Sequence, residues 1–228
     1  MVVPFLAHSP EAFALFGLWD RVCRGLANPR AVPSGLTRYV RGLRAAPGRV
    51  LAGPNSKVGG SGQWNIDGKL TVGVIGMPFS MNADHTLVTN NGTFNSSGHV
   101  RIDKGARVVV DPGASLTIGD GTFINCFSIV HARHSISIGS NCAISWRCEL
   151  LDSNYHQLDF PGRQDHVGDI VIGNDVWIGA GCRLLPGTDL GDGCVVAAGS
   201  TVTGAFEPAT LLGGTPARPL RDNVTWKL

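Results

Sequence analysis

The sequence lacks the features of a membrane-spanning, secreted or metal-binding protein. No apolar run approaches the roughly 20 residues that a membrane span needs. The first ten residues, MVVPFLAHSP, carry no basic region of the kind that begins a signal peptide, so we expect a cytoplasmic protein. The six cysteines include no CxxC pair, which disfavours a disulfide framework and a zinc site. We therefore expect no metal ligands.

The chain also has little net charge. Its formal charge is +2 over 228 residues, and no nucleic-acid-binding motif accompanies it, so we expect no nucleic-acid partner. The exception is the stretch before Val50, where seven arginines stand against two acidic residues. A solvated basic face is the usual reason for such a run. Peripheral contact with a membrane surface is the alternative that the charge leaves open.

What the sequence does have is a repeat of six residues. Within residues 169–203, an aliphatic residue recurs at every sixth position: Ile172, Ile178, Leu184, Leu190, Val196 and Val202. Four residues after these positions the side chains are small: Val176, Cys182, Thr188, Cys194 and Ser200. This period predicts very short strands joined by sharp corners, and three such strands close one coil. Stacked coils then bury the aliphatic and small rows inside a solenoid.

Four of the six cysteines fall in the small row. They are Cys142, Cys148, Cys182 and Cys194. A cysteine at such a position is a small hydrophobe. We predict that these four thiols are reduced and buried.

The repeat begins near Ile102 and slips several times by two residues, which keeps the inward face inward. After Leu150 the next repeat position would be residue 156, yet the pattern resumes at Ile172, which leaves 16 extra residues. Long interruptions of a compact repeat are usually functional or disordered. We therefore expect an inserted catalytic loop over residues 151–169.

The remaining sequence divides into less regular parts. Residues 1–49 are expected to be a helical and basic segment, with a helix from Ser9 to about Leu26 that covers an end coil. Residues 50–101 are expected to form irregular first coils and loops. The solenoid of regular coils then spans residues 102–217, and a tail occupies residues 218–228.

Several segments resemble one family. The segments VIGNDVWIGAGC, VVAAGSTVT and GGTPARPLR and the loop LLDSNYHQLDF resemble the hexapeptide-repeat acyltransferases, and are most similar to the sugar and polysaccharide O-acetyltransferases. The resemblance covers about residues 102–221. It implies a fold that is an all-β solenoid, a left-handed parallel β-helix, to which we add the N-terminal α-helix. The left hand comes from the resemblance alone, because connections between parallel strands are generally right-handed.

The resemblance also implies a catalytic base. His156, in the segment DSNYH, matches the family histidine that takes the proton from the acceptor hydroxyl while the acetyl group passes directly from acetyl-CoA. Asp152, Glu149 or a backbone carbonyl would orient the imidazole. His131 and His134 are candidates for the acceptor-binding groove, or ordinary coil residues.

The same resemblance implies a coenzyme A groove between the subunits of a homotrimer. The matching positions are Trp177, Ala180, Ala198 and Thr203, with Arg218 and Arg221 suited to the cofactor phosphates. Two residues depart from the family pattern. Gly204 stands where relatives often carry a lysine, and Arg147 stands where sugar acetyltransferases often carry an acceptor-binding asparagine, which points to a different, acidic acceptor.

Two other functional classes remain as alternatives. A γ-type carbonic anhydrase is also a left-handed β-helix, with zinc held by three histidines, but its ligand pattern is missing here. A non-catalytic solenoid that binds saccharide is the second alternative. Within the transferases, a serine acetyltransferase is disfavoured because its large helical domain is absent. The sequence therefore favours O-acetyl transfer to a sugar or polysaccharide precursor.

Overall fold

The computed structural model describes residues 49–81, 83–156 and 167–227, and every element in these ranges is a strand. The predicted N-terminal helix and basic segment lie outside the described residues. The 19 strands are β1 (Arg49–Ala52), β2 (Ser56–Gly59), β3 (Gln63–Val72), β4 (Thr86–Asn90), β5 (Thr93–Ile102), β6 (Arg107–Val110), β7 (Ser115–Ile118), β8 (Phe123–Ile124), β9 (Ile129–Ala132), β10 (Ser135–Ile138), β11 (Ala143–Ile144), β12 (Glu149–Leu151), β13 (Ile170–Ile172), β14 (Trp177–Ile178), β15 (Arg183–Leu190), β16 (Val195–Val196), β17 (Thr201–Phe206), β18 (Leu211–Gly214) and β19 (Ala217–Arg221). In this part of the chain, no helix is long and apolar enough to cross a membrane.

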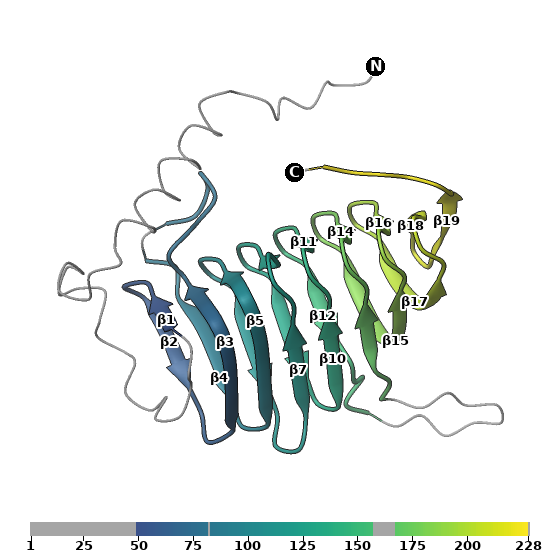
Figure 1. Ribbon diagram of the computed structural model, residues 1–228. Coiled ribbons are helices and arrows are strands. Elements are labelled where there is room, and N and C mark those ends of the chain that lie inside the picture. Colours follow the sequence, from purple (N-terminus) through teal and green to yellow (C-terminus); the bar gives the residue numbers. More distant parts are fainter. Residues whose placement is uncertain (1–48, 82, 157–166, 228) are drawn as a thin grey trace.

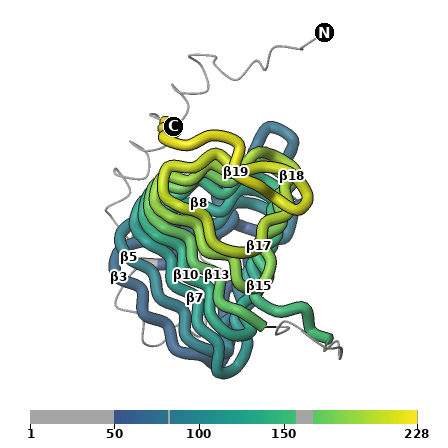
Figure 2. The backbone as a smooth tube through the Cα atoms, turned by 90° about the vertical axis from the view of Figure 1, so that its right-hand side faces the viewer, coloured from purple at the N-terminus to yellow at the C-terminus, as the bar shows by residue number. Residues whose placement is uncertain are grey.

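The strands form a stack of coils in chain order (Figure 1). Each strand pairs in parallel with its equivalent in the next coil, as in the runs β8–β11–β14–β16–β18 and β9–β12–β15–β17. Viewed from the side of the last coils, the successive coils lie over one another (Figure 2). The pair β18–β19 is antiparallel and ends the stack. The predicted parallel β-helix is thus confirmed, while its left hand stays a prediction.

The six-residue repeat forms three interior columns. Their members are Ile118, Ile138, Ile172 and Leu190; Ile124, Ile144, Ile178 and Val196; and Val130, Leu150, Leu184 and Val202. All twelve side chains are buried. Burying a large aliphatic side chain contributes about 1.5–3 kcal/mol, so these columns are the main stabilising feature of the fold. The four cysteines of the small row are also fully buried, as predicted.

The coils turn at corners where the backbone takes positive φ. One such column, which we call the Gly181 corner, consists of Gly105, Phe127, Arg147, Gly181 and Gly199. These corners are linked by backbone hydrogen bonds from one coil to the next. The N–H of Gly199, for example, donates at 2.9 Å to the carbonyl of Ala180, the residue before Gly181, and Phe127, Arg147 and Gly181 donate in the same way. Glycine adopts this conformation without a steric penalty, so Phe127 and Arg147 are the unusual members.

The spacing between paired residues locates two interruptions. Trp177 pairs with Val195, an offset of 18 residues, whereas Ala143 pairs with Trp177, an offset of 34. The predicted 16 extra residues therefore lie between β12 and β13. A second interruption follows β3, since Gln63 pairs with Thr93 at an offset of 30. It corresponds to the loop of residues 73–85, and the rest of residues 50–101 forms the paired strands β1 to β5.

After β19 the chain runs back over the last coils (Figure 1). The amide of Val224 donates to the carbonyl of Ala209 at 2.9 Å, and the indole Nε1 of Trp226 donates to the carbonyl of Asp175 at 2.5 Å. The tail is therefore fixed across the face that carries β14 and β16.

Candidate functional site

The stems of the inserted loop are attached to the coil below. Asp152, fully buried, accepts the backbone N–H groups of Arg133 and His134, each at 2.8 Å. Its own carbonyl accepts the N–H of Gly168 at 3.1 Å, and Ser153 forms a β-bridge with Val167. Hydrogen bonds from N–H groups to a carboxylate are stronger than those between neutral groups. The loop thus leaves the stack and returns at one point, which we call the loop corner.

His156 is exposed at the described end of this loop. Its backbone N–H donates to the carbonyl of Asn154 at 2.7 Å, and its ring has no hydrogen-bond partner among the described residues. The two carboxylates considered for orienting it have other partners. Asp152 binds the two amides named above, and Glu149 Oε2 lies 3.2 Å from Arg183 Nε. The structure therefore does not bring either carboxylate to His156.

The other two predicted histidines lie at the loop corner and each contacts an aspartate. His131 Nε2 is 3.1 Å from Asp111 Oδ1, and His134 Nδ1 is 2.5 Å from Asp169 Oδ1. The hydroxyl of Tyr155 also contacts His131 Nδ1. Both nitrogens of His131 are thus occupied, which leaves His156 as the histidine of this corner whose ring has no partner among the described residues.

Trp177 lies in β14, on a different side of the coil from the loop corner. Its side chain is 41% exposed, its Nε1 donates to Ser145 Oγ at 3.4 Å, and its ring centroid is 6.1 Å from that of Trp226. The C-terminal tail therefore covers part of the indole that we predict beside the cofactor.

Ala180 and Ala198 lie at the Gly181 corner, each just before a glycine of positive φ. A Cβ added to Gly181 or Gly199 would meet no atom within 4 Å, so the backbone there is open to a ligand. Arg147 is exposed at the equivalent position one coil earlier. These three predicted residues therefore share one strip of surface.

The remaining cofactor candidates are exposed and near the end of the stack. Thr203 donates its hydroxyl to the carbonyl of Pro186 at 3.2 Å. Arg218 and Arg221 extend from β19, and Arg218 donates to the carbonyl of Ala217 at 2.8 Å. Neither arginine has a carboxylate partner among the described residues, so both guanidinium groups are available to an anion.

The candidate base and the open cofactor strip lie at two separate corners. Arg147 precedes β12 and Asp152 follows it, so the Gly181 corner and the loop corner are one strand apart, roughly 15 Å. Among the described residues, the candidate base and the candidate cofactor strip therefore lie at separate corners of the coil.

Buried thiols do not provide an alternative nucleophile. Burial raises the pKa of Cys142 to about 11 and that of Cys148 to about 12. A thiolate is the reactive form, and it is scarce at neutral pH under these conditions. The described residues also contain no group of three or more His, Cys, Asp and Glu side chains that could hold a metal ion.

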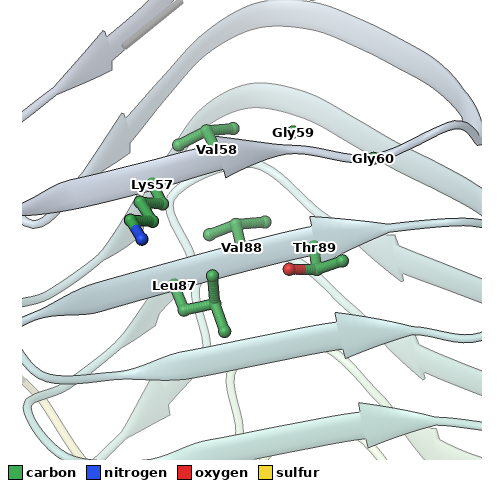
Figure 3. A pocket seen from close by; sticks show the side chains of 7 residues that line it. All are labelled: Lys57, Val58, Gly59, Gly60, Leu87, Val88 and Thr89. Carbon is green, nitrogen blue, oxygen red and sulfur yellow. The ribbon is translucent and has the colours of Figure 1, made fainter. Parts of the chain in front are cut away.

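A cavity of about 290 Å³ lies on β2 and β4, near the start of the stack. Lys57, Val58, Gly59, Gly60, Leu87, Val88 and Thr89 line it (Figure 3). None of the predicted site residues is among them. We therefore do not assign the cavity to the site.

Sequence reasoning missed several residues near the two corners. At the loop corner these are Asp111 and Tyr155, and over the last coils it is Trp226. At the Gly181 corner, Phe79 of the loop at residues 73–85 lies 5.7 Å from Trp146 between ring centroids. Tyr155 adjoins His156 in the segment DSNYH, and this neighbourhood is the one feature of the sequence that could have pointed to it. The others occur in turns or tails with no periodic pattern.

Comparisons with known proteins agree with the fold. The family described as bacterial transferase hexapeptide (six repeats) matches residues 169–204. An uncharacterized 24.8 kDa protein in the cps region of Klebsiella pneumoniae is 30% identical over 166 residues, which are 72% of this chain and 74% of that protein. The galactoside O-acetyltransferase of Escherichia coli is 31% identical over 113 residues, 48% of this chain and 55% of that enzyme. The chain thus spans about half the length of this enzyme.

A solved structure is similar over more of the chain. The polysialic acid O-acetyltransferase OatWY has a TM-score of 0.58 at 21% identity, covering 84% of this chain and 92% of that one. At this identity the likeness concerns the fold.

Proposed function

Because the chain belongs to the family of bacterial hexapeptide-repeat transferases, we propose that it transfers an acetyl group from acetyl-CoA to a hydroxyl of a sugar or polysaccharide precursor. The observation that carries the proposal is the 34-residue coil, because its inserted loop presents an exposed histidine with no side-chain partner among the described residues. The galactoside O-acetyltransferase relative supports a sugar acceptor.

The proposed chemistry is a direct transfer with His156 as general base. An alcohol is too weakly acidic to attack a thioester readily, whereas a neutral imidazole can accept the proton as attack occurs. The acceptor oxygen forms a bond to the thioester carbon, the carbon–sulfur bond breaks, and the coenzyme leaves as a thiolate that takes up the proton. Backbone N–H groups would stabilise the intermediate oxyanion.

The donor would lie along the Gly181 corner. The open backbone at Gly181 and Gly199, next to Ala180 and Ala198, supports this proposal. Trp177 would border the donor, and Arg218 and Arg221 would bind its phosphates. Arg147 at the same corner would bind an acidic group of the acceptor. Thr203 is a further cofactor contact in this proposal.

A homotrimer is part of the proposal, because the two corners of one subunit are a strand apart. Packing of three subunits side by side around a threefold axis would place the loop corner of one against the Gly181 corner of the next, as resemblance to the family implies. Sedimentation at micromolar concentration should give three times the mass of 24.0 kDa. An active monomer would contradict this arrangement.

The test of the function is His156→Ala, followed by thiol release from acetyl-CoA with a methyl galactoside and a methyl glucuronoside as acceptors. Loss of a positioned base should lower the rate about 10²- to 10⁴-fold. Acetyl-CoA affinity and melting temperature should stay unchanged, because the side chain of His156 is exposed. The matched control is His85→Ala, in the loop of residues 73–85.

Two outcomes would redirect the proposal. If His156→Ala kept more than about a tenth of the rate, the base would have to be His131 or His134. If acetyl-CoA failed to raise the melting temperature of the parent protein, a non-catalytic saccharide-binding solenoid would be the better description, since a ligand of the native state must stabilise it.

A further inference from the structure

Four side chains from three successive coils meet directly beneath the described part of the inserted loop. We call them the loop anchor: Asp111, which follows β6; His131 in β9; Arg133, just after β9; and Tyr155 in the loop. The carboxylate of Asp111 lies 3.1 Å from His131 Nε2 and 3.2 Å from Arg133 Nε. The hydroxyl of Tyr155 contacts His131 Nδ1, and Arg133 Cζ is 4.6 Å from the centre of the Tyr155 ring.

The partners of His131 define its role within the anchor. Because a carboxylate only accepts, we assign the proton to Nε2, which donates to Asp111, and the lone pair of Nδ1 then accepts the hydroxyl of Tyr155. In this arrangement both ring nitrogens of His131 have a partner. To accept a substrate proton it would have to release Tyr155, so its geometry suits fixing the loop better than acting as a base.

The backbone of Tyr155 needs such fixing. Its φ is 62°, a left-handed conformation that a residue with a large side chain adopts at a cost in free energy. Conformations of this kind persist where the surroundings determine them, and they gather at functional sites. Here the anchor holds the side chain, while Ser153 Oγ accepts the Tyr155 N–H at 3.1 Å. The next residue in the chain is His156.

We propose that Asp111, His131 and Tyr155 form a positioning unit that fixes the backbone from which His156 projects. The inference rests on the proposed function, in which His156 is the base. None of the three residues takes part in proton transfer. Their effect is geometric, because a displacement of about 1 Å at a catalytic group can cost about 10²-fold in rate.

The test uses two variants that change few atoms. Tyr155→Phe removes the hydroxyl and keeps the ring beneath Arg133, and Asp111→Asn removes the charge and keeps the shape. Each should lower kcat about 10- to 100-fold with the better of the two glycoside acceptors, and leave KM for acetyl-CoA unchanged. The double variant should lose no more than the single variants, because residues that act as a unit are not additive.

Hydrogen exchange supplies a readout that needs no acceptor. In Tyr155→Phe the peptide that covers residues 152–156 should exchange faster, while the peptide that covers β11 stays protected. The matched control is Asp120→Asn, at another corner, where the carboxylate accepts the His99 N–H at 2.6 Å. This control should change neither kcat nor exchange in the loop.

The two proposals fail in different ways. If exchange in the loop and kcat are unchanged in Tyr155→Phe, or if the effects of Tyr155→Phe and Asp111→Asn simply add, the positioning unit is wrong, whatever His156→Ala does. If Tyr155→Phe loosens the loop while His156→Ala remains fully active, His156 is not the base, and if the parent protein transfers no acetyl group to either acceptor, the proposed function is wrong.

Discussion

Arg147 occupies the corner position that Gly181 occupies one coil later, and the two residues share a positive φ, 57° and 69°. For a side chain with a Cβ this conformation costs roughly 1–2 kcal/mol. A bulky cation at a place where glycine would fit better is therefore a sign that the side chain serves a function. Acceptor binding is the role that we propose for it.

Arg147→Gly separates that role from folding. Glycine relieves the strained φ, so the variant should be at least as stable as the parent, by up to about 1 kcal/mol in the free energy of unfolding. KM for the acidic methyl glucuronoside should rise, because the guanidinium that pairs with the carboxylate is gone, while KM for acetyl-CoA stays constant. Steady-state kinetics and urea unfolding measure both effects.

Asn141→Gly is the matched control for this variant. Asn141 has a φ of 57° at a different corner, equivalent to Gly121 one coil earlier. It should show a similar change in stability and no change in KM for either acceptor. Equal acceptor kinetics in Arg147→Gly and Asn141→Gly would remove Arg147 from the acceptor site.

The contact between Trp177 and Trp226 gives a second prediction. Aromatic pairs contribute about 0.5–1.5 kcal/mol beyond their buried area. If Trp226 holds the indole of Trp177 beside the cofactor, Trp226→Ala should weaken acetyl-CoA binding by up to about tenfold and increase fluorescence quenching by acrylamide. Calorimetry measures the affinity.

Trp226→Phe is the companion variant. It keeps an aromatic ring against Trp177 and removes the N–H that donates to the Asp175 carbonyl. Its affinity for acetyl-CoA should lie between those of the parent and Trp226→Ala. If Trp226→Ala binds acetyl-CoA as tightly as the parent, the tail does not contribute to the cofactor site.

The sequence predicted the regular half of the fold to the residue. Positions such as Ile178 and Leu184 lie in the interior columns because one inward position per side recurs in every coil, and this regularity is visible in a single sequence. The inserted loop followed from the same count. The earlier coils were harder to place because β3 and β5 are ten residues long and the loop of residues 73–85 interrupts the period.

The contacts of the site were less predictable, for a physical reason. Asp111 is 20 residues from His131 and lies in a turn, and Trp226 is 49 residues from Trp177 and lies in the tail, so one partner of each contact falls outside the six-residue pattern. Such contacts depend on the path of loops and tails, which local preferences do not determine. Asp152 illustrates the difference, since its place in the recognised segment suggested catalysis, whereas its carboxylate binds two backbone amides of the coil below.

The buried cysteines give a third prediction. Because burial raises the pKa of Cys142, Cys148, Cys182 and Cys194, their thiols should react slowly with a thiol reagent in the folded protein and rapidly in denaturant. Mass spectrometry of the labelled peptides identifies each site. Rapid labelling of all four under native conditions would contradict the interior register.

The last prediction concerns Asp103, which is buried beside Arg101 near the Gly181 corner. Burial raises the pKa of Asp103 to about 6, although Arg101 Nε at 2.8 Å from the carboxylate acts in the opposite direction. The folded state therefore holds this proton at pH values where the unfolded chain, with a pKa near 3.9, has released it. The contribution to stability is complete below about pH 4 and is lost as the pH rises through about 6.

Asp103→Asn removes this ionisation. Two pKa units correspond to about 3 kcal/mol, so the free energy of unfolding of the parent should fall between pH 4 and pH 7 by a few kcal/mol relative to the variant. Urea unfolding at several pH values measures both curves, and their difference isolates Asp103 because the other carboxylates contribute equally to each. Parallel curves over this range would show that Asp103 ionises at its ordinary pKa in the folded protein.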